Sequence, residues 1–171
     1  SISQDLATVV GYAQSVSKIS DGAFDITVAP AINAWGFGPA NASAAPSANT
    51  LLEARQHSGY LKLELRESPL ALRKLDPRLQ IDLSAIAKGY AVDQLAYLLE
   101  DRGIDRYLVE IGGEIRTSGT RPDGQSWRIG IQPPDDTLNI EYVVIPAGAI
   151  ATSGDYRNFY LLDEPTNYLD L

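Results

Sequence analysis

The chain has 171 residues, of which 22 are acidic and 14 basic, so its formal net charge is −8, and it contains no cysteine. This length suits a single domain that buries roughly 70% of the surface of its unfolded chain. The negative charge argues against nucleic acid or an anionic membrane as the main partner, and the lack of cysteine excludes disulfides and thiolate metal ligands. An anionic ligand would therefore need a local positive site or a metal ion.

Helices are predicted in the first sixty residues. Apolar side chains recur at helical spacing through the first eighteen residues, which predicts an amphipathic helix. Residues 22–39 are apolar and aromatic, with glycine and proline between them, and residues 40–49 predict a surface loop of small residues. Thr50 and Glu53 have the spacing of a capping box and predict a short helix that ends before Gly59.

From residue 61 the apolar side chains alternate with polar ones, which is typical of strands. Strands are predicted at residues 61–65, 70–75, 79–82, 107–111, 114–118, 127–131 and 140–145, with an extended stretch at 150–160. A helix is expected from Ser84 to Arg102, and residues 121–124 predict a hairpin turn. The pattern indicates an α+β fold with a mostly antiparallel sheet and packed helices, without internal repeats.

Residues 82–93 carry the clearest chemical signal. They place Asp82 at a predicted strand end, Ser84 as a helix cap and Lys88 in the first turns of the helix. The free amides and the dipole at a helix start favour an anion, so a lysine there predicts a phosphate or pyrophosphate site. A nearby carboxylate can hold a divalent cation against such a group. The alternative is an ordinary helix, with Asp82 as a capping acid and Lys88 on a solvated face.

Three other segments could belong to the same site. Asp25 lies between an aromatic and β-branched residues, and the glycine-spaced aromatics of residues 33–39 could line a planar ring or simply pack in the core. Residues 110–115 contain paired glycines, which either let the backbone approach a ligand or form a bulge. Residues 150–158 collect hydroxyls, an acid and an arginine, a combination that is also common on exposed strands.

His57 is the only histidine, and it lies in the last turn before Gly59. A histidine there meets the negative end of the helix dipole. Because no potential metal ligand lies at a suitable spacing, a structural role is predicted.

Taken together, these segments resemble, in order and spacing, the ApbE family of FAD:protein FMN transferases. The matching segments are Gly-Ala-Phe-Asp-Ile-Thr at 22–27, Trp-Gly-Phe-Gly-Pro at 35–39, Asp-Leu-Ser-Ala-Ile-Ala-Lys-Gly-Tyr-Ala at 82–91, Tyr-Leu-Val-Glu-Ile-Gly-Gly-Glu at 107–114 and Ala-Thr-Ser-Gly-Asp-Tyr-Arg-Asn-Phe-Tyr at 151–160. The resemblance covers residues 1–160 and implies an ApbE-like, T-fold-like flavin transferase domain that is truncated at both ends.

The resemblance implies an enzyme that binds FAD and Mg²⁺ and transfers FMN to a Thr or Ser hydroxyl of an acceptor protein, with release of AMP. It implies catalytic roles for Asp25 and Lys88 and a metal contact from the backbone carbonyl of Ala85. The residues that it places at FAD are Ala23, Phe24, Asp25, Asp82, Lys88 and Ile150. It also implies a bacterial, exported protein, periplasmic or facing the periplasm, with membrane contact only through a lipid anchor outside these residues.

The C-terminal residues depart from the family pattern. Members carry a His-x-Ile-Asp-Pro-x-Thr-Gly segment whose acid and threonine complete the magnesium site, whereas residues 161–171 resemble the Walker B and D-loop segment of ABC-type ATPases. An ATPase is not expected, because the nearest P-loop match has Gln125 in place of the lysine. Asp163 or Asp170 could replace the missing metal acid, and Asp155 or Tyr156 is a candidate base.

Two alternatives to the transferase stay open at this point. One is a flavin-binding module without chemistry, because half of the expected metal site is missing. The other is an FAD pyrophosphatase, since some members of the family hydrolyse FAD to FMN and AMP.

Overall fold

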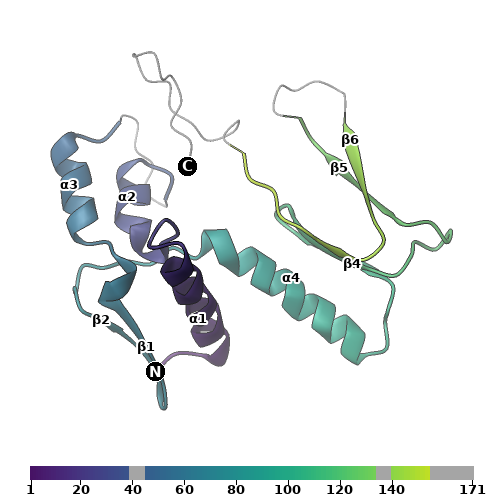
Figure 1. Cartoon of the computed structure of the whole chain (residues 1–171), viewed down its shortest axis with the longest axis horizontal. Helices are drawn as coiled ribbons and strands as arrows, with labels where there is room; N and C mark the ends of the chain where they lie inside the picture. The colour runs from purple at the N-terminus through teal and green to yellow at the C-terminus, as the bar shows by residue number, and fades with distance from the viewer. Residues whose placement is uncertain (39–44, 134–139, 155–171) are drawn as a thin grey trace. The chain divides into compact units, whose positions relative to one another are not determined.

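The computed structural model describes residues 1–38, 45–133 and 140–154 (Figure 1). The chain divides into two compact units, residues 1–86 and 87–171. The predicted domain at residues 1–160 and the tail at 161–171 stay predictions, because the tail lies outside the described residues. Among those residues, no helix combines the length and apolar character needed to cross a membrane.

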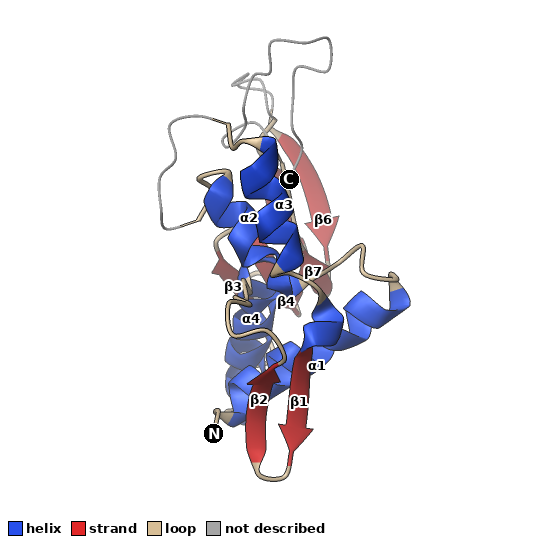
Figure 2. Ribbon diagram, turned by 90° about the vertical axis from the view of Figure 1, so that its left-hand side faces the viewer, coloured by secondary structure: helices blue, strands red, loops and turns tan. Residues whose placement is uncertain are grey.

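The first unit contains helices and one antiparallel hairpin. Its elements are α1 (Gln4–Ile19), the 3₁₀ turn η1 (Ile26–Val28), α2 (Ala29–Ala34), α3 (Ala48–Gln56), the 3₁₀ turn η2 (Tyr60–Lys62), β1 (Leu63–Glu67) and β2 (Leu70–Lys74). The hairpin of β1 and β2 lies beside α1 (Figure 2). The predicted helix in the first eighteen residues is confirmed, and the Ser3 hydroxyl caps it by accepting a hydrogen bond from the Leu6 N–H.

The core of the first unit joins segments that are distant in sequence. Val10 and Ala13 of α1 are completely buried against Ile26, Leu63 and Leu79. Further apolar side chains pack around this cluster: Leu6, Phe24, Leu72, Ile81, Leu83 and Ile86. Burial of these apolar surfaces is the main favourable contribution to the stability of the unit.

The strand predicted at 61–65 corresponds to β1, which begins two residues later because residues 60–62 form η2, and the strand predicted at 70–75 corresponds to β2. Two other local predictions for this unit were wrong. Residues 79–82 are not a strand, because their backbone meets a 3₁₀ turn rather than a strand edge, and the Asp82 N–H donates to the Ile26 carbonyl at 2.7 Å. Helix α3 begins at Ala48 rather than at Thr50, and Ser47 is its cap. The Ser47 hydroxyl accepts the Thr50 N–H at 3.2 Å, so a serine three residues upstream performs the capping role that the sequence suggested for Thr50.

The second unit consists of two antiparallel sheets and most of a long helix. Its elements are α4 (Ser84–Asp101), β3 (Tyr107–Ile111), β4 (Glu114–Ser118), β5 (Trp127–Ile131), β6 (Glu141–Ile145) and β7 (Gly148–Ile150). One sheet has the order β3-β4-β7, and β5 pairs with β6. The predicted helix and the predicted strands at 107–111, 114–118 and 127–131 are confirmed, and the strand predicted at 140–145 begins one residue later.

The predicted hairpin at residues 121–124 is wrong in one respect. A turn is present, since the Gly124 N–H donates to the Arg121 carbonyl at 2.9 Å. The strands on either side of it are β4 and β5, which do not pair, because β3 and β7 occupy both edges of β4. Of the extended stretch predicted at 150–160, residues 151–154 have no regular structure and the rest lie outside the described part.

Helix α4 packs on β3 through Val92 and Ala96, which lie one turn apart and contact Tyr107 and Val109. Arg116 of β4 adds an electrostatic clamp to this contact. Its guanidinium lies 2.9 Å from an Asp93 oxygen and 3.1 Å from a Glu100 oxygen, and 4.7 Å from the centre of the Tyr97 ring. These charge-assisted contacts raise the pKa of Arg116, first through the hydrogen bond with Asp93, and keep the side chain charged.

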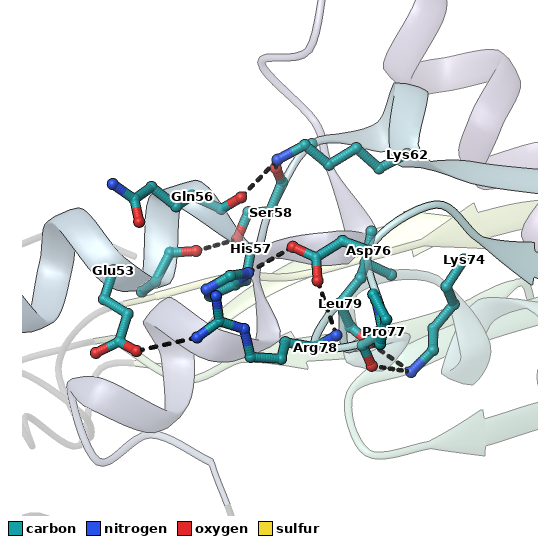
Figure 3. A network of polar contacts seen from close by, with 12 residues as sticks. Glu53, Gln56, His57, Ser58, Lys62, Lys74, Asp76, Pro77, Arg78 and Leu79 are labelled. Atoms are coloured by element: carbon teal, nitrogen blue, oxygen red, sulfur yellow. Dashed lines mark hydrogen bonds and ion pairs between the residues drawn. The ribbon is translucent and has the colours of Figure 1, made fainter.

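A polar network in the first unit centres on His57, the residue that caps the C-terminus of α3 (Figure 3). The imidazole is buried, and its Nδ1 lies 2.5 Å from Asp76 Oδ2. The other Asp76 oxygen accepts the Arg78 N–H at 2.8 Å. The histidine is therefore placed as predicted, but its partner lies nineteen residues away along the chain, and no spacing pattern indicated it.

Asp76 should make stability sensitive to acid. The hydrogen bond with His57, and then that with the Arg78 N–H, hold the pKa of Asp76 below the ordinary 3.8. The folded carboxyl therefore deprotonates at a lower pH than the unfolded one, so its contribution is complete above about pH 4 and is lost as the pH falls further. We expect D76N to lower the free energy of unfolding at neutral pH and to differ less from the original chain as the pH approaches 3.

Urea unfolding between about pH 3 and pH 7 measures this difference. The control is D21N, which changes the same group at an exposed position. A gap between D76N and the original chain that stays constant with pH would contradict the assigned role of the carboxylate.

Candidate functional site

Both oxygens of the Asp25 carboxylate accept hydrogen bonds from residues of the first unit. Its Oδ1 accepts hydrogen bonds from the Thr27 N–H at 2.8 Å and the Thr27 hydroxyl at 2.7 Å, and its Oδ2 accepts the Tyr60 N–H at 2.8 Å. The Thr27 oxygen in turn accepts the Gly59 N–H at 2.6 Å. Because Thr27 is completely buried, this network ties residues 25–27 to the chain that leads into β1.

Ala23 and Phe24, the other FAD contacts predicted in this segment, differ in their surroundings. Ala23 is exposed, whereas the Phe24 ring is partly buried and packs on the core. The Phe24 N–H is held by the Ser20 hydroxyl at 3.1 Å. Phe24 therefore has at least a packing role, which was one of the two interpretations of these aromatic residues.

Asp82 lies directly beside the Asp25 segment, since its N–H bonds the carbonyl of Ile26. Its carboxylate accepts hydrogen bonds from the N–H of Ser84, at 2.7 Å, and from the Ser84 hydroxyl. The acceptor at the start of α4 is thus Asp82, and the prediction that Ser84 acts as the cap was wrong. Ala85 follows in the first turn of the helix and is exposed.

Lys88 belongs to the second unit and lies against the paired glycines. Its ammonium is 2.7 Å from Glu114 Oε2 and donates a hydrogen bond to the Gly112 carbonyl at 3.1 Å. Gly112 and Gly113 have φ values of 56° and 95°, a region that favours glycine. A Cβ at Gly112 would lie 3.1 Å from Cδ of Lys88, so a side chain there would press on the lysine.

Lys88 and Ile150 line one cavity of about 930 Å³ in the second unit. Its wall also contains Glu110, Gly112, Gly113, Ile115, residues 129–132 and residues 151–154. Cavities of roughly this size hold extended small molecules. The contribution of β5 through residues 129–131 was not predicted, because its alternating apolar pattern looks like that of any half-buried strand.

The structure thus brings the predicted residues together in two groups. Ala23, Phe24, Asp25, Asp82 and Ala85 lie in the first unit, where one backbone hydrogen bond joins their two segments. Lys88 and Ile150 lie in the second unit, on the wall of the same cavity.

The described residues alone do not fit a magnesium site. They contain no group of three or more His, Cys, Asp or Glu side chains that could hold a metal ion. Mg²⁺ prefers octahedral coordination by oxygen, while Asp82 and the Ala85 carbonyl would supply only part of such a set. The candidate metal acids Asp163 and Asp170 and the candidate bases Asp155 and Tyr156 lie outside the described residues.

Comparison with known proteins identifies the relatives of this chain. The model of the ApbE family matches residues 1–169. The chain belongs to the ApbE family. This match includes most of the segment 161–171, and the ATPase resemblance of that segment gains no support from the comparisons.

Several ApbE relatives have names that state their function. The FAD:protein FMN transferase of Vibrio cholerae is 42% identical over 165 residues, which is 95% of this chain and 49% of the relative. That of Salmonella typhimurium is 40% identical over 167 residues, or 95% of this chain and 48% of the relative. The chain therefore spans about half the length of the curated relatives that it matches.

Solved ApbE structures confirm the α+β fold. The flavin transferase ApbE from Vibrio cholerae superposes with a TM-score of 0.83 at 42% identity, covering 92% of this chain and 52% of that one. The flavinyl transferase ApbE of Pseudomonas stutzeri gives a TM-score of 0.82 at 36% identity, covering 99% of this chain and 52% of that one.

The Asp25 network leads to a prediction about stability. D25N replaces one acceptor oxygen by an NH₂ group, which cannot accept the hydrogen bond of Tyr60 or of Thr27. We expect a loss of about 1–3 kcal/mol in the free energy of unfolding, the usual result of leaving a partly buried donor unpaired. Urea or thermal unfolding checks this, with D21N as the exposed control; equal stability of D25N and the original chain would show that the network is dispensable.

Proposed function

We propose that this protein acts as an FAD:protein FMN transferase, which moves FMN from FAD to a Thr or Ser hydroxyl of an acceptor protein and releases AMP. The observation that carries the proposal is the cavity in which Lys88, the glycine pair and Ile150 converge. Its wall also offers the hydroxyl groups of Thr152 and Ser153. The names of the relatives, at about 40% identity, support the same activity.

The proposed reaction exchanges the phosphoanhydride bond of FAD for a phosphate ester bond to the acceptor. The acceptor oxygen forms a bond to the phosphorus of the FMN part, the bond from that phosphorus to the bridging oxygen breaks, and AMP leaves with that oxygen. The hydroxyl proton passes to a base. Negative charge on the phosphoryl oxygens is offset by the Lys88 ammonium, and catalysis of this kind depends on positioning and electrostatic stabilisation.

Asp25 and Lys88 take different parts in this proposal. Lys88 lines the cavity and is the residue that would touch the phosphates. Asp25 uses both carboxylate oxygens on the backbone and the Thr27 hydroxyl, which favours a positioning role over direct chemistry. Through these bonds Asp25 would hold Ala23 and Phe24 in place for FAD, next to the segment of Asp82.

The proposal includes Mg²⁺ because the family resemblance implies it. When bound at a pyrophosphate, the ion neutralises charge on the leaving AMP. Ala85 would supply its backbone carbonyl, and the remaining ligands would come from outside the described residues. A periplasmic location and a lipid anchor outside these residues are part of the same proposal.

An FAD pyrophosphatase is the second candidate, because the same cavity and lysine would serve a reaction in which water replaces the acceptor hydroxyl. A flavin-binding module without chemistry is the third. AMP release together with covalent flavin on an acceptor protein supports the transferase. AMP release without labelled acceptor supports the pyrophosphatase, and FAD binding without AMP supports the module.

A titration of Lys88 variants with FAD tests the proposed role of the lysine. We expect K88A to weaken FAD binding about tenfold, the range for loss of one charged hydrogen bond, and to reduce AMP release further. K88R should retain part of the binding because it keeps the charge. Flavin fluorescence, with and without magnesium, measures the affinity, and K18A on the exposed face of α1 is the control. Unchanged affinity and turnover in K88A would refute the phosphate-binding role.

A further inference from the structure

The glycine pair between β3 and β4 is fixed on both sides. Before it, the Glu110 carboxylate accepts the Gly113 N–H at 2.8 Å. After it, Glu114 begins β4 and pairs with Ile111 across the sheet. The turn therefore gives the Glu114 side chain a defined position relative to the cavity wall.

Glu114 faces Lys88 from the more buried side of the pair. Its side chain is 16% exposed, whereas that of Lys88 is 41% exposed, and the two charges lie 2.7 Å apart. Lys88 lines the cavity and Glu114 does not, so the lysine is the member of the pair that a ligand in the cavity would meet. A partly buried ion pair of this kind is screened less by salt than a surface pair.

The hydrogen-bonding capacity of Lys88 is not exhausted by these contacts. An ammonium group has three N–H donors. Among the described residues its polar contacts are the Gly112 carbonyl at 3.1 Å and the Glu114 carboxylate at 2.7 Å. The Gly112 contact is a hydrogen bond, whereas the Glu114 contact is an ion pair whose Oε2 has no hydrogen-bond partner in the described part of the chain. At least one donor of the ammonium is therefore left for a ligand in the cavity.

We propose that Glu114 is the positioning residue for Lys88, which it holds against the Gly112 carbonyl so that the remaining donor meets a phosphate oxygen. This inference rests on the proposed function for its phosphate partner, but the contact between the two side chains can be tested without flavin. Glu114 itself does not need to touch the substrate. Loss of its charge should leave ligand attraction intact, since a negative charge is removed, while the direction of the ammonium is lost.

The first test measures the reactivity of Lys88 in the free protein. The purified chain is acetylated with N-hydroxysuccinimidyl acetate, and each lysine is followed by mass spectrometry, with exposed Lys18 as the internal reference. We expect E114Q to raise the relative labelling rate of Lys88 about fivefold, the factor that corresponds to about 1 kcal/mol for a partly exposed ion pair. E114D keeps the charge on a shorter side chain and should give an intermediate rate.

The matched control is D101N, which removes one charge from the exposed far end of the same helix. It should leave the labelling of Lys88 unchanged. Thermal unfolding shows whether each variant is folded. A folded E114Q or E114D in which Lys88 reacts at the original rate would overturn the proposal.

The second test separates positioning from general damage. In E114Q we expect kcat for AMP release to fall about tenfold while the Kd for FAD stays within about threefold, because the barrier and the affinity respond to different interactions. Parallel loss of both would indicate a structural role only and would overturn the proposal. If Lys88 labelling changes as expected but no variant binds FAD, the positioning role stands and the proposed function fails.

Discussion

The Asp25 carboxylate connects the segments on which the first unit depends. It accepts hydrogen bonds from Thr27 and Tyr60, and the Thr27 oxygen accepts another from Gly59. One side chain therefore fixes the 3₁₀ turn η1 to the start of η2, which leads into β1, and η1 in turn offers the Ile26 carbonyl to Asp82. Ile26, whose carbonyl takes part in this last bond, packs with Leu79 in the core of the unit.

In the second unit, the central interaction holds the Lys88 side chain at the wall of a cavity. A lysine on a helix has a long and mobile side chain, and ordering it costs conformational entropy. Here the carbonyl of Gly112 and the carboxylate of Glu114 limit that freedom before any ligand arrives. The two glycines make this possible, since their conformation turns the carbonyl toward the lysine and leaves space for its methylene groups.

Periodicity in the sequence was sufficient to predict the helices and strands that bury one face. Helices α1 and α4 and the strands β3, β4 and β5 were predicted because their apolar residues repeat with the period of the element. Residues 79–82 were wrongly predicted as a strand, since Leu79 is buried and Ile81 partly buried in an irregular segment whose apolar residues alternate as in a strand. Hydrogen bonds between distant side chains, such as His57 with Asp76, leave no periodic trace. The cavity wall from β5 was missed because its alternating pattern is that of any half-buried strand, whereas Lys88 was predicted from its place at a helix start and Ile150 from the family resemblance.

Arg116 restricts the rotation of α4 about its own axis. Rotation of an α-helix about its own axis moves every side chain that projects from it, and the tip of a long side chain such as lysine moves farthest. Arg116 binds Asp93 and Glu100 on one side of the helix and lies over the Tyr97 ring. Because Arg116 belongs to the neighbouring sheet, these contacts hold the helix in one rotational position. Lys88 lies five residues before Asp93 on the same helix, so these contacts also orient Lys88. They come from β4, the strand that also carries Glu114. A single strand, β4, thus determines both the orientation of the helix and the place of its lysine.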